Sequence, residues 1–219
     1  MRYYPICLDI QNRTCLVVGG GSVGTRKVIT LLNCGAHVTV VSPAASARLQ
    51  ELANNGSIIL KKRFFRSSDL ANMFLVCSAT DNQELNRQIH TEAESLGMLC
   101  NVADRPEVCN FILPSIVNRG DLIIAISTSG QSPAFAKKLR KDLEKVFGNE
   151  HAEFLKLMGA VRKKLLRQDH RPKAHKHLFE QLINGGLVDM IKAHQYEDID
   201  ALLFETLGKG YQFKSLMHE

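Results

Sequence analysis

The sequence predicts an α/β protein in which helices cover a parallel sheet. Short apolar runs rich in β-branched residues alternate with helical patterns through the first 127 residues. The runs are apolar on both faces, as in strands buried within a parallel sheet, and their alternation with helices is typical of βαβ units. From about residue 149 onward only helical patterns remain. We therefore expect an N-terminal parallel-sheet domain and a helical C-terminal domain.

The apolar runs place strands at 14–18, 37–42, 57–62, 73–79, 97–102 and 121–127. The intervening patterns predict helices at about 22–34, 44–54 and 81–96. The third helix opens on "TDNQEL", where Asp81 or Thr80 can cap the exposed amides.

The pattern changes near residue 113. Pro114 and the turn "NRGD" precede a single strand, and a long helix then opens with Ser132 as its cap and Pro133 in its first turn. Gly148 offers a stop to this helix. The expected divisions are residues 1–113, 114–148 and 149–219.

Composition narrows the class of protein. The chain has 219 residues, 45% of them hydrophobic, and a formal charge of +6, which favours anionic partners without selecting one. Its six cysteines form no C-x-x-C pair and sit mostly in apolar runs, so we expect reduced thiols and a cytoplasmic protein. No stretch approaches the roughly twenty apolar residues of a membrane span, and we expect neither an export signal nor a membrane anchor.

The stretch "CLVVGGGSVGTRKV" contains the most informative motif. Gly19, Gly21 and Gly24 form G-x-G-x-x-G directly after a strand and at the mouth of a helix, the context in which this motif binds a dinucleotide. Gly19 makes the tight turn, Gly21 lets the backbone approach a pyrophosphate, and Gly24 lets the helix pack on the strand. The amides at Ser22 and Val23 open the helix and face the phosphates. A glycine-rich turn without a ligand is the alternative.

The acid that often binds the ribose hydroxyls is missing. The second strand ends in "VVSP", so Ser42 and Pro43 occupy the place of that acid. Ser42 can bond a ribose hydroxyl, and Arg48 could meet a 2′-phosphate. The residues alone leave NAD and NADP open.

A carboxylate follows the fifth strand, in "NVADRPEVCNFILPS". Asn101 and Asp104 would project from the carboxyl end of that strand, where ligands bind in open α/β sheets. Asp104 is a candidate general base, and a cap for the following turn is the alternative role.

Five stretches together resemble the precorrin-2 dehydrogenase family. They are "PICLDIQNRTCLVVGGGSVGTRKV", "VSP", "ATDNQELN", "NVADRPEVCNFILPSI" and "IAISTSGQSPAFAKKLRKDLE", and they cover residues 1 to about 148 in unbroken order. The family includes the N-terminal half of bacterial sirohaem synthase and a yeast enzyme that also inserts iron. The resemblance implies an N-terminal Rossmann domain, a small central α/β dimerisation region and a helical C-terminal domain.

The resemblance also implies an activity, which is NAD-dependent oxidation of precorrin-2 to sirohydrochlorin, sometimes followed by iron insertion. The family's acid falls on Asp104, which would serve both reactions. Members use NAD without a ribose acid, so "VVSP" favours NAD here. A homodimer built from residues 114–147 is expected, since one strand and one helix have too few neighbours to bury themselves. No histidine cluster lies near the acid, and we expect no dedicated metal site.

A tetrapyrrole with many carboxylates would need cationic and amide partners. Asn101 and Lys137, together with the turn of Ser127, Thr128, Ser129 and Gly130, are the candidate substrate contacts. For the lysines of the long helix that contains Lys137, the alternative is a solvent-exposed face without a ligand. For Thr128 the preferred interpretation is a hydroxyl that hydrogen-bonds the backbone of a turn. Modification of Thr128 is a further possibility that the resemblance suggests.

Two other functions would require different residues. An NAD(H)-binding redox sensor would need the glycine loop but no catalytic acid, so Asp104 discriminates against it. The basic tail permits a nucleic-acid partner, but no recognition motif accompanies it, and none is expected. A short-chain reductase would carry Tyr-x-x-x-Lys, and no tyrosine has a lysine four places on.

Overall fold

A computed structural model of the protein describes residues 2–103, 105–168 and 175–218. The chain divides into two compact units, Met1–Leu113 and Pro114–Glu219. The predicted further division at residue 148 stays a prediction.

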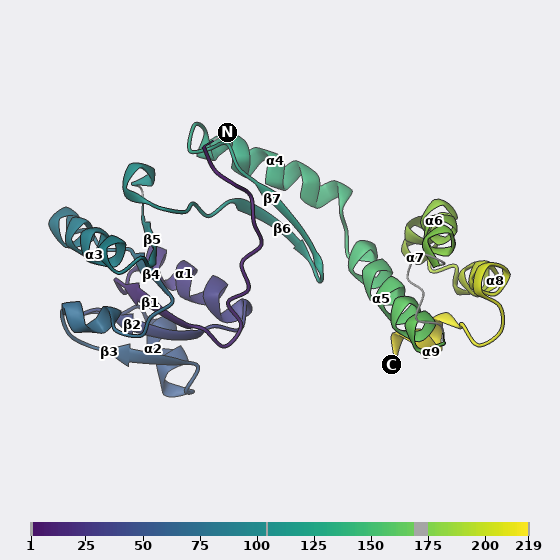
Figure 1. Ribbon diagram of the computed structural model, residues 1–219, viewed down its shortest axis with the longest axis horizontal. Coiled ribbons are helices and arrows are strands. Elements are labelled where there is room, and N and C mark those ends of the chain that lie inside the picture. Colours follow the sequence, from purple (N-terminus) through teal and green to yellow (C-terminus); the bar gives the residue numbers. More distant parts are fainter. Residues whose placement is uncertain (1, 104, 169–174, 219) are drawn as a thin grey trace. The chain divides into compact units, whose positions relative to one another are not determined.

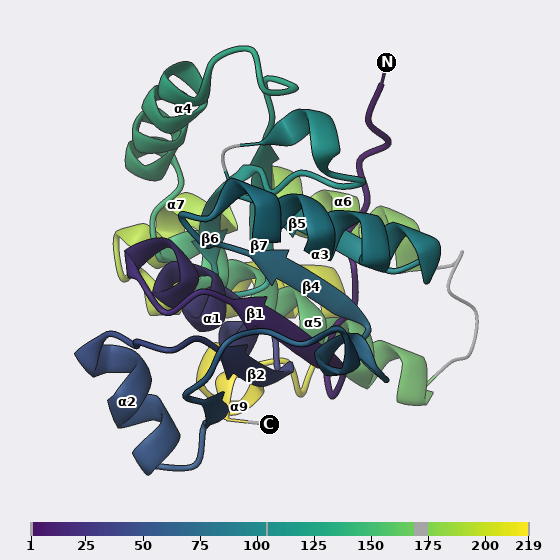
Figure 2. The ribbon, with the colours of Figure 1, turned by 90° about the vertical axis from the view of Figure 1, so that its left-hand side faces the viewer.

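Five strands form the sheet of the N-terminal unit, in the order β3-β2-β1-β4-β5 (Figures 1 and 2). They are β1 (Thr14–Val18), β2 (His37–Val41), β3 (Ile58–Lys61), β4 (Leu75–Ser78) and β5 (Leu99–Val102). All neighbouring pairs are parallel, so the carboxyl ends of the strands meet at one edge. The chain leaves β1 in one direction toward β3 and later returns beside β1 with β4. Ligands bind at such a reversal in open α/β sheets.

Helices cover both faces of this sheet, as predicted (Figure 2). On one face α1 (Ser22–Asn33) and α2 (Ala47–Asn54) pack on a core that includes Val17, Val40 and Cys77. On the other face α3 (Gln83–Ser95) and the short 3-10 helix η1 (Ser67–Leu70) pack on a core that includes Leu16 and Val76. A second 3-10 helix, η2 (Pro106–Val108), follows β5.

The helix caps were predicted in part. Ser132 accepts a hydrogen bond from the amide of Phe135, as expected for the cap of the long helix. For α3 the expected caps Thr80 and Asp81 were wrong, because the side chain of Asn82 accepts from the amide of Leu85. Asparagine caps a helix as well as aspartate does, so the sequence "TDN" offers three adjacent candidates.

The junction of β1 and α1 is the tightest turn of the unit. Gly19 has a φ of +114°, and a Cβ built there would lie 2.2 Å from the carbonyl oxygen of Ala79. A Cβ at Gly24 would lie 2.1 Å from the carbonyl oxygen of Gly19. Gly24 therefore lets the helix pack on the end of β1, and Gly19 lets the loop after β4 approach the same turn, at distances that only glycine permits.

The second unit begins with a β-hairpin, which corrects the expectation of a single strand after "NRGD". The strands β6 (Ser115–Arg119) and β7 (Leu122–Ile126) pair antiparallel, and "NRGD" forms the turn between them with Gly120 at a φ of +62°. The short run "SIVNR" holds only two apolar residues, which is why the strand was missed.

The helix α4 (Pro133–Val146) packs on this hairpin, and Arg119 joins the two. Its guanidinium donates to the carbonyl oxygens of Glu144 and Phe147, at 3.0 Å and 2.7 Å. The last carbonyls of a helix lack partners within the helix and carry partial negative charge, so a guanidinium there is stabilising. These hydrogen bonds join the hairpin to the C-terminal end of α4, which lies beside the hairpin in Figure 1.

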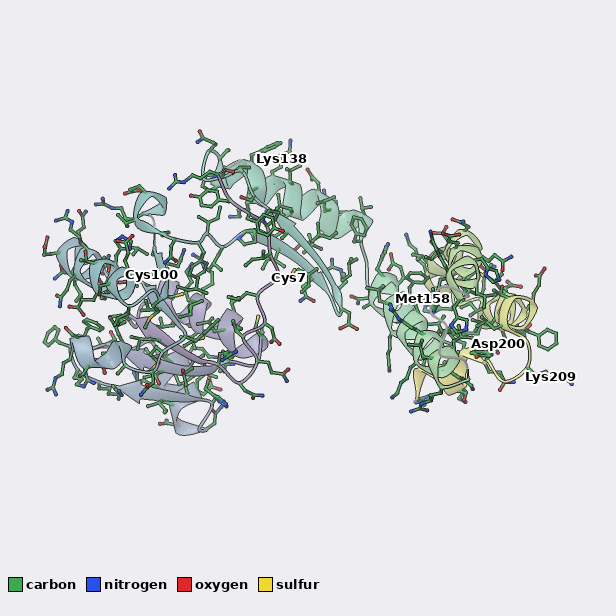
Figure 3. All side chains as sticks on the ribbon, viewed as in Figure 1. Cys7, Cys100, Lys138, Met158, Asp200 and Lys209 are labelled. Carbon is green, nitrogen blue, oxygen red and sulfur yellow. The ribbon has the colours of Figure 1, made fainter. Side chains whose placement is uncertain are left out.

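The rest of the second unit is helical, as predicted. It comprises α5 (Glu150–Gln168), α6 (Lys176–Asn184), α7 (Leu187–Lys192), α8 (Tyr196–Leu207) and α9 (Phe213–Met217). Met158 of α5, labelled in Figure 3, belongs to their shared core together with Leu182 and Leu203. The exposed face of α5 carries the expected basic residues, Lys156, Arg162, Lys163 and Arg167.

All six cysteines are free thiols, and four are buried: Cys15, Cys77, Cys100 and Cys109. Burial raises the pKa of Cys15 and Cys77 to about 11, and that of Cys100 to about 12. Cys7 and Cys34 are exposed, and Figure 3 shows Cys7 on the extended N-terminal segment. Among the described residues, no helix combines the length and the apolar composition that a membrane span requires.

Replacing Gly24 with alanine tests the junction of β1 and α1. The added methyl group must displace the backbone at Gly19, and overpacking of this kind costs about 1–3 kcal/mol of unfolding free energy. Gly159→Ala is the matched control, because a Cβ at this position within α5 meets no atom within 4 Å. We expect that control to gain about 0.5–1 kcal/mol from helix propensity. Urea denaturation measures both, and equal stabilities of the two variants would contradict the close approach.

Candidate functional site

A cleft of about 670 Å³ lies at the carboxyl edge of the parallel sheet. Its walls are the loops that follow four strands: residues 18–23 after β1, 41–46 after β2, 64–65 after β3 and 79–82 after β4. Six of the seven predicted cofactor residues line it, namely Gly19, Gly21, Ser22, Val23, Ser42 and Pro43. The seventh, Gly24, lies beneath them and carries the close contact of α1 with β1.

The glycine loop leaves its backbone open toward the cleft. A Cβ built at Gly21 would meet no atom within 4 Å, so the space beside this backbone is free in the cleft wall. Gly21 is also the N-cap of α1 and has no side chain to satisfy the first amides of the helix. Such amides and the partial positive charge of the helix end suit a phosphate group. The loop therefore fits the pyrophosphate of a dinucleotide.

The loop after β2 is joined to the glycine loop by hydrogen bonds. The amide of Ser46 donates to the carbonyl oxygen of Gly20 at 2.9 Å, and its hydroxyl lies 2.8 Å from the Thr25 hydroxyl. The Ser46 hydroxyl also caps α2, since it accepts from the amide of Leu49. One serine thus fixes the spacing of two cleft walls. Neither Thr25 nor Ser46 was predicted from the sequence.

The loop after β4 is held by Asn86, a buried residue of α3. The Asn86 amide nitrogen donates to the carbonyl oxygen of Thr80, and its oxygen lies 2.6 Å and 2.7 Å from the hydroxyls of Thr80 and Ser78. These contacts fix the wall of the cleft opposite the loop after β2. The motif "ATDNQELN" ends in this asparagine.

Three basic side chains of α2 and of the segment at the end of β3 form ion pairs with acids. Arg48, the candidate partner for a 2′-phosphate, lies 2.7 Å from the carboxylate of Glu51 on the same helix. Lys61 and Arg63, at the end of β3, both contact Asp69.

At the end of β5 the side chain of Asn101 is buried and uses both of its polar atoms within the N-terminal unit. Its oxygen accepts from the Lys27 ammonium at 2.9 Å, and its nitrogen donates to the carbonyl oxygen of Phe111 at 3.2 Å. A role as a substrate contact stays a prediction. Asp104, the predicted base, lies outside the described residues, and β5 ends at Val102, two positions before it in the sequence.

The remaining predicted residues belong to the second unit, in the turn before α4. Thr128 accepts from the amide of Ser132 and Ser127 from the amide of Ser129, both at 3.1 Å. Ser129 and Gly130 have φ values of +52° and +84°. The preferred interpretation of Thr128, a hydroxyl that satisfies the backbone of a turn, is confirmed. Lys137 is exposed on α4, and binding of substrate by this group stays a prediction.

The sequence of the chain matches two known family models. A family model described as putative NAD(P)-binding matches residues 6–115. The chain belongs to this NAD(P)-binding family. A second model, described as sirohaem biosynthesis protein central, matches residues 119–145. Together they cover nearly all of the N-terminal unit, the strand β7 of the hairpin and all but the last residue of α4.

Similar whole proteins agree with the family assignment. The siroheme synthase of Nitrosococcus oceani is 36% identical over 96% of this chain and 45% of its own length. That of Methylococcus capsulatus is 34% identical over 94% and 44%. The chain thus spans about half the length of these curated relatives. The solved structure of SirC, precorrin-2 dehydrogenase, matches 91% of this chain and 98% of its own with a TM-score of 0.73 and 29% identity. The resemblance inferred from the motifs is confirmed.

Replacing Gly21 with aspartate tests the phosphate site of this family. The side chain has room to enter the cleft without disturbing the fold, but it places bulk and negative charge where the pyrophosphate would lie. We expect NADH affinity to fall at least about tenfold in a fluorescence titration, with an unchanged circular-dichroism spectrum. Gly21→Ala separates bulk from charge and should lie between the two. An affinity equal to that of the wild type would reduce the loop to a structural turn.

Proposed function

We propose that the protein oxidises precorrin-2 to sirohydrochlorin with NAD as the hydride acceptor. The observation that carries this proposal is the glycine-lined cleft at the carboxyl edge of the sheet, in a chain that matches 98% of the precorrin-2 dehydrogenase SirC. The similar siroheme synthases support the same pathway. Bound NAD would supply the hydride acceptor for this chemistry.

Residues of the chain have separate tasks in this proposal. The backbone of Gly19–Val23 binds the pyrophosphate, and Ser42 bonds a ribose hydroxyl in place of the usual acid. NAD is favoured over NADP by the resemblance to precorrin-2 dehydrogenases, and the basic side chains of Arg48, Lys61 and Arg63 are each paired with an acid.

Oxidation of the substrate removes a hydride from one carbon and a proton from a neighbouring centre, so a base is needed beside the nicotinamide. Asp104 is the proposed base. It follows β5 by two residues, and β5 neighbours β4 on the side of the sheet away from β2 and β3. The proposed contacts of the substrate carboxylates are Asn101 in the N-terminal unit and, separately, Lys137 and the turn of residues 127–130 in the second unit. Insertion of iron is a further proposed use of the same carboxylate, because metal entry must strip protons from the pyrrole nitrogens.

An anaerobic assay with enzymatically made precorrin-2 tests the activity directly. Appearance of the sirohydrochlorin absorption spectrum with NAD, at a rate well above that with NADP, is the expected result. Cofactor binding without any turnover would contradict the proposed dehydrogenase activity and favour a redox-sensing module as the function.

Replacing Asp104 with alanine tests the proposed base. We expect a loss of about 100-fold or more in dehydrogenase turnover, the usual contribution of a positioned general base. Iron or cobalt insertion, if the wild type performs it, should be lost as well, whereas NAD affinity should not change. The measurements are anaerobic turnover and a cofactor titration. Turnover near the wild-type rate would leave Asp104 as a turn cap.

The homodimer is proposed to form through the hairpin and α4. Residues opposite one another in the register share a face, so Ile116, Asn118, Ile123 and Ala125 lie together on one side of the two-stranded sheet. Ile116 is 39% exposed and Ile123 54%, while Val117 on the other face is fully buried. A two-stranded sheet with an open apolar face is marginal alone, and a second copy would cover it.

Replacing Ile123 with aspartate tests this dimer. A carboxylate on the apolar face would be buried unpaired at the interface, so the variant should be monomeric at micromolar concentration. Ile59→Asp is the matched control, because Ile59 is 62% exposed on β3. This variant should keep the mass of a dimer in solution. Multi-angle light scattering distinguishes the outcomes. A wild type that is itself monomeric would contradict the proposal.

A further inference from the structure

Phe64 is an aromatic side chain that the fold leaves exposed in the wall of the cleft. It follows β3, lines the cleft and is 76% exposed. The adjacent Phe65 also lines the cleft, but it packs against the core on the α3 side of the sheet. The two rings therefore differ in function: Phe65 anchors the loop, and Phe64 contributes nothing to the core.

The backbone at Phe64 is held in place by an ion pair beneath it. The carboxylate of Asp69, only 3% exposed, accepts two hydrogen bonds from the Arg63 guanidinium and one from the amide of Arg66. The Lys61 ammonium lies 3.1 Å from the same carboxylate. The Arg63 guanidinium also holds the pKa of Asp69 well below its usual range, so the carboxylate is charged at neutral pH.

Arg63 has a second contact that reaches the aromatic residue itself. Its guanidinium donates to the carbonyl oxygen of Phe64 at 2.8 Å. The residues on both sides of Phe64 are thereby fixed through one buried acid. An exposed ring on a loop held this firmly loses little further freedom when a flat ligand covers it.

The order of the strands says which half of a dinucleotide this ring would meet. The pyrophosphate belongs at the glycine loop after β1, and the adenosine ribose at the end of β2. β3 is the next strand outward on that side, whereas β4 and β5 lie on the other side of β1. The loop of Phe64 therefore faces the adenosine half, and the end of β5, before Asp104, lies on the nicotinamide side.

We propose that Phe64 is the platform on which the adenine ring of the dinucleotide stacks. This inference rests on the proposed function, in that it takes the cleft to bind NAD. Stacking on an aromatic ring uses the flat face of the base and needs no charged partner. It supplies affinity at the adenosine end of a cleft whose second strand ends in Ser42 and Pro43 instead of an acid. Asp69 and Arg63 act as positioning residues for the platform.

The absence of tryptophan from the chain provides a direct test. Phe64→Trp introduces a single indole, whose fluorescence should be quenched on titration with NAD and equally with ADP-ribose. Nicotinamide mononucleotide, which lacks the adenine, should leave the signal unchanged. Phe204→Trp is the matched control, since Phe204 is 56% exposed on α8, and its indole should not respond to any of the three.

The affinity of a truncated variant provides the second measurement. In calorimetry, Phe64→Ala should bind NAD and ADP-ribose about tenfold more weakly than the wild type, as expected for one lost base-stacking contact. Its affinity for nicotinamide mononucleotide should not change. The melting temperature should stay that of the wild type because the ring is exposed. Phe64→Tyr should restore the affinity, since it keeps the stacking face.

The outcomes separate this inference from the function on which it rests. A wild-type chain that binds no NAD by calorimetry overturns both. Normal NAD binding by the wild type, with no loss in Phe64→Ala and no quenching in Phe64→Trp, overturns the stacking platform alone. A response of the indole to nicotinamide mononucleotide equal to that with ADP-ribose overturns the assignment to adenine.

Discussion

The close approach of α1 to the end of β1 is the constraint on which the cleft depends. A helix can begin this near a strand only where Gly24 carries no side chain, and the loop after β4 can approach the same turn only where Gly19 carries none. Once the helix starts there, its first amides point along the carboxyl edge of the sheet. The loops after β2 and β4 then attach to this turn, the former through the Ser46 amide on Gly20 and the latter through the packing of Ala79 against Gly19.

Neutral groups join the walls of the cleft, and an ion-pair cluster on Asp69 lies behind the loop after β3. Ser46, Thr25 and Asn86 hold their loops with hydroxyl and amide hydrogen bonds. Asp69 is buried with Arg63 and Lys61 beside it, which keeps its charge away from the phosphate site. No repulsion from Asp69 therefore opposes a doubly anionic pyrophosphate in this cleft. At the ribose, Ser42 stands in place of the usual carboxylate.

Much of this architecture could be predicted from local patterns. The five parallel strands are short and mostly apolar, and the glycine spacing identifies the turn after β1. β6 was missed because only Ile116 and Val117 are apolar in it, and its pairing with β7 depends on tertiary contact. Phe64 and Ser46 could not be found in this way, since each becomes part of the cleft only when strands distant in sequence align their ends. The cap Asn82 was missed by one position among three suitable neighbours.

The distribution of thiols has a consequence for chemical labelling. At neutral pH an alkylating reagent attacks thiolates, and the thiols of Cys15, Cys77 and Cys100 are both buried and, because of their raised pKa, almost wholly protonated. Cys7 and Cys34 are exposed and accessible to the same reagent. Slow alkylation of the buried cysteines would therefore report how often the parallel sheet opens. The rate of this alkylation measures local unfolding.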